Sequence, residues 1–247
     1  MLAALFIAWL QLSPCDAGAV IELDANESLP YFSATLPMDG MAGDIIHAMS
    51  KASGMSSYIS YKPLSRMISD DSNNDLGDPA FFMRNQHFQA VIPFALTHMA
   101  LFYYGQGHAG HGNIDSLNAL KGRTVGVLKG TIVNRSYLAR AGVIFEESYS
   151  HDSLFKKLRK GRIDLVVEVD LIGRTVIEKL YPDEQKAFDM HLIPKSEGAL
   201  AILLSDTQPD AQSFGQRYNR GLRKIIENGC CSASKIDPLE GQNSVQN

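Results

Sequence analysis

Cysteine, tryptophan and long apolar runs are scarce in this chain, and each shortage narrows what the protein can be. Its 247 residues include three cysteines and one tryptophan. A chain of this length can bury a core without disulfide bonds, so the cysteines are not needed as a folding framework. Beyond the N-terminus, no stretch approaches the roughly 20 apolar residues of a membrane-spanning helix. We therefore expect a globular protein of one large or two small domains.

Strong charge asymmetry is also missing. The formal net charge is −4, without a basic block or an acidic tail, which argues against nucleic acid as a partner. His108 and His111 form the one histidine pair with ligand-like spacing, in a glycine-rich loop, and two imidazoles without further ligands make a poor metal site. We expect no metal ion and no cofactor.

The N-terminus has the pattern of an export signal. Leu2–Leu12 is a compact apolar run, and Ala17 and Ala19 fit a small-residue cleavage site. Residues 1–19 are therefore predicted to be a signal peptide, which places the mature protein in the periplasm. The first basic residue is Lys51, whereas signal peptides usually begin with basic residues, and a buried N-terminal helix is the alternative.

The cysteines are compatible with export. Cys15 approaches a lipoprotein box, but Pro14 replaces the usual small residue, so lipid anchoring is the minority interpretation. If cleavage follows Ala19, only the adjacent Cys230 and Cys231 remain. Neighbouring cysteines bridge only through a strained ring, so we interpret this pair as free or externally paired thiols.

The signal-peptide interpretation makes a prediction about mass. The mature protein is expected to begin at Val20 and so to lack Trp9, the only tryptophan. Intact-mass measurement on protein recovered from the periplasm tests this. A retained Trp9 contradicts it.

The most informative stretch is Lys121–Asp170. KGRTVGVLKGT predicts a short buried strand followed by a turn at Gly130–Thr131 into a helix. A helix that opens there points free backbone N–H groups and its positive dipole end at whatever lies above the strand, which suits an anion. Ser150 or Asp152 can cap the next helix, and Gly161 ends it before a second buried strand, IDLVVEV.

Strands and helices alternate along the remainder, which predicts an α/β fold. The second half forms an α/β unit of its own, and the segment after Pro194 resembles the first half again in character. The chain is expected to leave the first lobe near Tyr104–Gly107 and to return near Lys195–Gly198. The predicted division is lobe 1 from residues 20–105 and 197–236, lobe 2 from residues 106–196, and a polar tail of residues 237–247.

These segments, in this order, resemble the periplasmic solute-binding proteins of polar amino-acid ABC transporters, known as solute-binding protein family 3. KGRTVGVLKGT and YSHDSLFKKLRKGRIDLVVEVD are similar to that family's LKGKxVGVxxGT turn, its serine before a helix and its GRxDAVVxD strand. LPYF and GMAGDIIHAM are weaker similarities. The resemblance implies a two-lobed, type II periplasmic-binding-protein-like fold with two hinge crossings.

By the same resemblance, the expected function is to close both lobes on a small polar or anionic, amino-acid-like solute. The partners would be that solute and the membrane permease of an ABC transporter, and the protein would be a monomer without enzymatic activity. One alternative is a solute sensor for a signalling partner. A second is a dehydratase-like enzyme on the same fold, with Glu168 or Glu197 as its acid.

Four candidate ligand contacts follow from the first lobe and the Gly-Thr turn. Thr131 could hold a carboxylate, or simply cap a helix. Tyr31 could stack on the ligand or pack between a loop and a helix. Arg84 could grip an anion bidentately together with Thr131, although it lies before the arginine of the family's TPER motif and could equally be solvated. Arg66 is a second basic candidate.

The acids at the end of the IDLVVEV strand are the remaining candidates. The resemblance implies an aspartate that accepts the ligand ammonium, but that position is occupied by Val169, between Glu168 and Asp170. Strand alternation places both acids on the face opposite to Val169, so either a local bulge returns one acid to the cleft or the ammonium site is absent. Asp164 is expected to cap the turn or to pair with Arg162.

Overall fold

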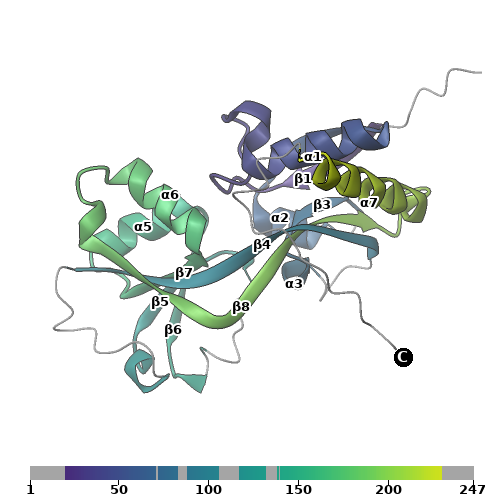
Figure 1. Ribbon diagram of the computed structural model, residues 1–247. Helices are drawn as coiled ribbons and strands as arrows, with labels where there is room; N and C mark the ends of the chain where they lie inside the picture. Colours follow the sequence, from purple (N-terminus) through teal and green to yellow (C-terminus); the bar gives the residue numbers. More distant parts are fainter. Residues whose placement is uncertain are drawn as a thin grey trace, which may run out of the picture.

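The computed structural model describes residues 20–70, 72–82, 88–105, 117–131, 138 and 140–229. These residues form two α/β lobes that share one eight-stranded mixed sheet, as Figure 1 shows. The strand order is β2-β1-β3-β8-β4-β7-β5-β6. The expected two-lobed α/β fold is confirmed.

The first lobe contains one end of the sheet with its covering helices. Its strands and helices are β1 (Val20–Ala25), β2 (Ser56–Tyr61), β3 (Asp75–Gly77), the short helix η1 (Pro37–Asp39), α1 (Gly40–Ser53), α2 (Leu64–Ser69), α3 (Pro79–Phe82) and α7 (Ala211–Glu227). Helices α1 and α7 pack side by side, although they lie at opposite ends of the chain (Figure 1). Gly221 permits this approach, because a Cβ there would lie 2.5 Å from the carbonyl oxygen of Met49.

The second lobe contains the other end of the sheet. Its strands and helices are β5 (Thr124–Leu128), β6 (Ile144–Ser148), β7 (Leu165–Val169), α5 (His151–Arg159), α6 (Asp170–Leu180) and the short helices η2 (Leu117–Leu120) and η3 (Gln185–Ala187). The side chain of Ser150 caps α5 by accepting the N–H of Ser153 at 3.2 Å, and Gly161 follows with a φ of 64°. Both helix-end predictions are confirmed.

Two long strands, β4 (Phe88–Tyr104) and β8 (Phe188–Ser205), run through both lobes. They pair antiparallel from Phe88 opposite Ser205 to Tyr104 opposite Phe188, and Figure 1 shows them crossing together from one lobe to the other. The sequence suggests shorter separate strands here. Residues Met99 to Phe102 already pair with β7, ahead of the expected crossing at Tyr104–Gly107. The exact lobe boundaries stay a prediction.

Each face of the second lobe's sheet buries apolar side chains. Leu165 and Val167 of β7 point into one cluster, with Leu120 and Val125. Val166 points the other way, into the larger cluster that continues into the first lobe. Within the described residues, no helix is both long and apolar enough to cross a membrane.

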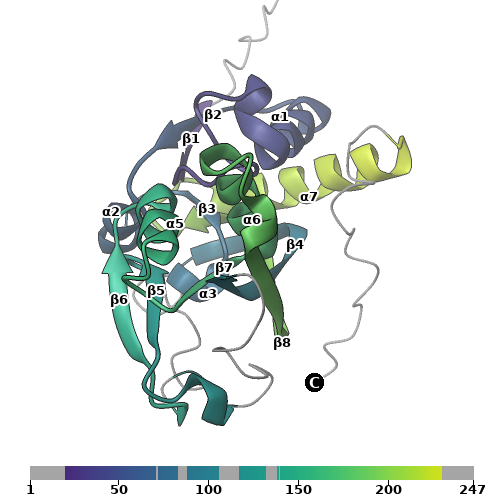
Figure 2. The same cartoon turned by 90° about the vertical axis from the view of Figure 1, so that its left-hand side faces the viewer.

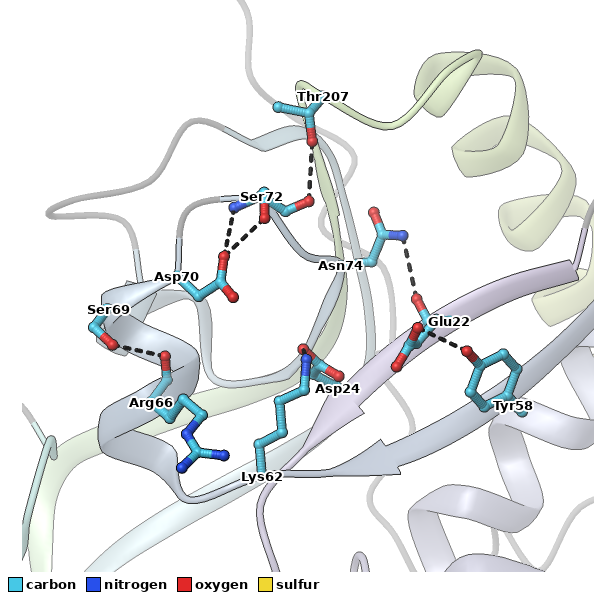
Figure 3. Close-up of polar contacts among 10 residues, drawn as sticks. All are labelled: Glu22, Asp24, Tyr58, Lys62, Arg66, Ser69, Asp70, Ser72, Asn74 and Thr207. Carbon is cyan, nitrogen blue, oxygen red and sulfur yellow. Dashed lines mark hydrogen bonds and ion pairs between the residues drawn. The ribbon is translucent and has the colours of Figure 1, made fainter.

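Two fully buried aspartates lie on neighbouring strands of the first lobe. Asp24 of β1 and Asp75 of β3 are register partners, and each is 0% exposed. Lys62 reaches Asp24 at 2.6 Å, as Figure 3 shows, but neither carboxyl oxygen of Asp75 has a hydrogen-bond partner among the described groups. Burial, and then the charge of Asp24, raise the pKa of Asp75 to about 8. Asp75 is therefore protonated at neutral pH.

This raised pKa predicts a stability that falls as pH rises. An unfolded aspartate has a pKa of about 3.9, so the folded state binds the proton more tightly, and its advantage is lost between about pH 4 and pH 8. Asp75→Asn imitates the protonated acid. At about pH 8 the variant should be more stable than the parent by several kcal/mol, on the order of 5, with little difference at about pH 4.

Urea unfolding at both pH values measures this difference. Asp183→Asn, an exposed position, is the matched control and should change neither value. If Asp75→Asn destabilises the protein equally at both pH values, the carboxyl is not held protonated.

Candidate ligand-binding site

Two adjoining cavities lie where the lobes meet. The inner cavity, of about 60 Å³, is lined by first-lobe residues such as Asn26, Tyr31 and Asp78 and by Thr131 and Glu168 of the second lobe. The outer cavity, of about 560 Å³, also draws its lining from both lobes. The two cavities share four lining residues, so they lie side by side and are together called the cleft: Asn26, Leu64, Leu128 and His151.

The carboxyl ends of four strands supply this cleft. Asn26 follows β1, Asp78 follows β3, Leu128 ends β5, and Glu168 with Val169 ends β7. In open α/β sheets, ligands bind at this edge, because loops and helix starts converge there. Figure 2 views the molecule from the second lobe, with α5 and α6 in front of the first-lobe strands β1 and β3.

A buried ion pair forms one wall of the inner cavity. The Oε2 atom of Glu168 lies 3.1 Å from Nε2 of His151, and Oε1 accepts the backbone N–H of Val169 at 2.9 Å. The two side chains are only 9% and 10% exposed. Burial alone lowers the pKa of His151, but the Glu168 carboxylate outweighs it, so the pKa of His151 is raised and the protonated imidazole is favoured.

Asp78 is the second acid of the inner cavity. Its Oδ1 accepts the N–H of Ala80 at 2.8 Å, and burial against apolar neighbours raises its pKa. Among the described residues, no cation accounts for its charge. Gly198 leaves room for this carboxyl, because a Cβ there would collide with Oδ2 of Asp78.

Three of the six candidate residues lie together in the inner cavity. Tyr31 and Thr131 are 5% and 8% exposed, and Glu168 is 7% exposed. Burial, and then the charge of Asp170, raise the pKa of Tyr31 to about 12, so its hydroxyl stays protonated. Their roles as ligand contacts stay predictions.

Of the other three candidates, Asp170 and Arg66 line neither cavity, and Arg84 lies outside the described residues. Asp170 begins α6, where its Oδ1 accepts the N–H of Leu171, and it lines neither cavity. Arg66, drawn in Figure 3, lies on α2 and also lines neither cavity. Arg84 lies outside the described residues, as do His108 and His111. The same holds for most of the helix expected after Thr131.

The end of β7 departs from strict alternation, which corrects the expected placement of its acids. Val169 is the last residue of β7 and the N-cap of helix α6, and with a φ of −60° it no longer follows the strand's pleat. Glu168 and Val169 consequently both line the inner cavity, whereas Asp170 does not. Asp164 does not pair with Arg162 as expected: it accepts the N–H of Thr124 at 2.7 Å and lies 4.0 Å from Arg123.

Sequence reasoning missed Asp78, His151 and Asn26. Asp78 closes a polar stretch that reads as a loop, and the three-residue strand β3 before it is too short for a periodic signal. The position of His151 directly after the helix cap Ser150 was the available signal, since the cap faces the cleft. In the described part of the chain, no group of three or more acidic, histidine or cysteine side chains is placed to hold a metal ion.

Comparison with known proteins identifies the fold but no family. Neither protein-family models nor curated proteins match the sequence. Solved structures do match. A substrate-binding protein of an ABC uptake transporter from Streptococcus pneumoniae, with bound histidine, has a TM-score of 0.68 at 11% identity, covering 92% of this chain and 95% of its own. This chain has the periplasmic-binding-protein fold.

Two further structures extend the comparison to receptors. A histidine kinase sensor domain with similarity to periplasmic binding proteins has a TM-score of 0.68 at 17% identity, covering 89% of this chain and 96% of its own. The GluR0 ligand-binding core from Nostoc punctiforme, in complex with L-glutamate, has a TM-score of 0.64 at 19% identity, covering 85% and 94%. At these identities the likeness shows the fold.

The buried ion pair predicts a specific titration. In Glu168→Gln the carboxylate that raises the pKa of His151 is gone. Burial, the largest influence, is then opposed only by the weaker charge of Asp152, so the pKa should drop below the ordinary value of about 6.5. NMR titration of the histidine ring protons measures this. Glu178→Gln, on the outside of α6, is the control. An unchanged His151 pKa in Glu168→Gln would mean that the two side chains do not interact.

Proposed function

We propose that this protein is a periplasmic solute-binding protein that closes its two lobes on a small polar or charged, amino-acid-like solute. The observation that carries this proposal is a cleft at the carboxyl ends of β1, β3, β5 and β7, lined by both lobes. A solute held there would contact both lobes at once. Its binding energy then favours the closed arrangement over the open one.

The chemistry of the lining suits a polar solute. The inner cavity combines aromatic walls, including Tyr31 and Phe81, with a few polar groups such as Thr131 and Asp78. Small-molecule sites typically have this composition, because apolar walls exclude water while a few polar groups orient the ligand. Two solved structures of similar fold, one with bound histidine and one in complex with L-glutamate, support an amino-acid-like solute.

Delivery to a membrane permease of an ABC transporter, by a monomer, is part of the proposal. The fold likeness to an ABC uptake binding protein supports it. Sensing for a signalling partner is the second candidate, because a histidine kinase sensor domain is as similar in fold. We propose no enzymatic activity: Glu168 lines the cleft, paired with His151, and Glu197 lines neither cavity.

A thermal-shift screen tests solute binding. Purified protein is heated with single amino acids, small carboxylates and short peptides, and a true ligand raises the melting temperature by mass action. In Thr131→Ala the affinity for the hit should fall about fivefold to tenfold, the usual loss for one hydrogen bond. Thr175→Ala is the control, because Thr175 lies on α6 outside both cavities and bonds Leu171.

The alternatives have distinct outcomes. A stabilising solute whose affinity is unaffected by Thr131→Ala would place the binding site elsewhere. If no compound of the panel changes the melting temperature, the proposed function is wrong.

A further inference from the structure

The two cavities of the cleft differ in their charged lining. The inner cavity is lined by the carboxyls of Asp78 and Glu168. The outer cavity is lined by three lysines, Lys62, Lys129 and Lys179, and by two acids, Glu27 and Asp152. Because the cavities adjoin, a solute that spans both would meet acids at the inner end and an excess of lysines at the outer end.

Some of the charged side chains that line the cleft already pair with other side chains, so only the remaining ones are available to a solute. At the inner end, Glu168 already pairs with His151 at 3.1 Å. Asp78 is half-buried, and among the described residues no cation lowers its pKa. Removing part of a carboxylate's hydration without a counter-charge costs free energy. A positively charged group of the solute would remove that cost. Asp78 is therefore the acid that can bind an ammonium group of the ligand.

At the outer end, Lys129 is the corresponding available cation. Lys62 is bound to Asp24 at 2.6 Å, and Lys179 lies 3.3 Å from Asp152. The ammonium of Lys129 contacts Tyr149, with its hydroxyl at 3.0 Å and its ring centroid at 4.7 Å. The charge of Glu147 also acts on Lys129, more weakly than the contact with Tyr149. None of these groups removes the positive charge, so Lys129 can accept a carboxylate from the solute.

The sizes of the two cavities indicate how far apart the ammonium and the carboxylate of the solute must be. The inner cavity of about 60 Å³ has room for only a few water-sized groups, such as an ammonium and the carbon that bears it. Asp78 lines the inner cavity alone and Lys129 the outer cavity alone. In a free α-amino acid the ammonium and carboxylate share one carbon. A solute that reaches both residues must carry its two charges several bonds apart.

The junction of the cavities favours a peptide group between the charges. Asn26 and His151 line both cavities. The amide of Asn26 can donate and accept hydrogen bonds, as a peptide bond requires. The outer volume of about 560 Å³ leaves space for side chains.

We propose, on the basis of the solute-binding function above, that the ligand is an extended zwitterion of the dipeptide class. Its ammonium lies in the inner cavity beside Asp78, and its carboxylate lies in the outer cavity beside Lys129. One residue extends the chain by about 3.5 Å, so a dipeptide separates its termini further than any free α-amino acid does.

Calorimetric titration with matched probes tests the proposal. The panel contains the common amino acids, a set of dipeptides including Ala-Ala and Leu-Leu, and ω-amino acids such as 5-aminopentanoate. The tightest dipeptide should bind at least about tenfold more strongly than either of its component amino acids. Its N-acetylated and C-amidated forms should each lose about tenfold or more, because each lacks one charge.

Two variants assign the charges to residues. In Asp78→Asn the parent dipeptide should bind no better than its N-acetylated form, and in Lys129→Met no better than its C-amidated form. Lys186→Met, an exposed lysine outside both cavities, is the control and should keep the preference for both termini. Circular dichroism spectra are to be recorded to check that each variant is folded. The N-acetylated and C-amidated ligands test the same two contacts in the parent protein without any substitution.

The other outcomes separate this inference from the function on which it rests. If a free α-amino acid binds more tightly than every dipeptide, the proposal of an extended ligand is wrong, whereas the proposed solute-binding function is supported. If an ω-amino acid without a peptide bond binds best, the separated charges are right and the dipeptide class is wrong. If no compound binds, both the inference and the proposed function fail.

Discussion

The antiparallel pairing of β4 with β8 is the constraint on which the rest of the structure depends. The two strands pair along their length and carry β3 on one side and β7 on the other. Both lobes therefore belong to one sheet, and the carboxyl ends of the outer strands are brought to a shared cleft. The positions of two proposed site residues follow from that register, because Asp78 follows β3 and Glu168 lies in β7 opposite Ala100 of β4.

Charged groups are concentrated around this cleft at a cost to stability. Glu168 and His151 neutralise each other, Asp24 is matched by Lys62, and Asp75 keeps a proton because no partner is present among the described residues. Asp78 is the acid left without a counter-charge. Buried charges of this kind are tolerated where a ligand supplies the missing partner, which is why functional sites often combine burial with unpaired polar groups.

Local sequence rules predicted the fold well and the site in part. The Ser150 cap, the Gly161 helix end, the turn at Gly130 and the buried strand IDLVVEV depend on neighbouring residues alone, so they could be predicted. The length of β4 could not, because Pro93 is an apparent strand breaker that a register shift accommodates. Placing Glu168 and Asp78 in the site requires tertiary information. The position of Glu168 depends on where β7 ends and α6 begins, and that of Asp78 depends on the three-residue strand β3, which its neighbouring strands hold in place.

The central claim is that one solute is held between the lobes at the carboxyl ends of the strands. A crystal structure of the protein with its most stabilising solute tests it most directly. We expect solute density in the cleft, in contact with Asp78 of the first lobe and with Thr131 and the Glu168–His151 pair of the second. Solute bound to one lobe only, or at a surface away from these strand ends, would contradict it.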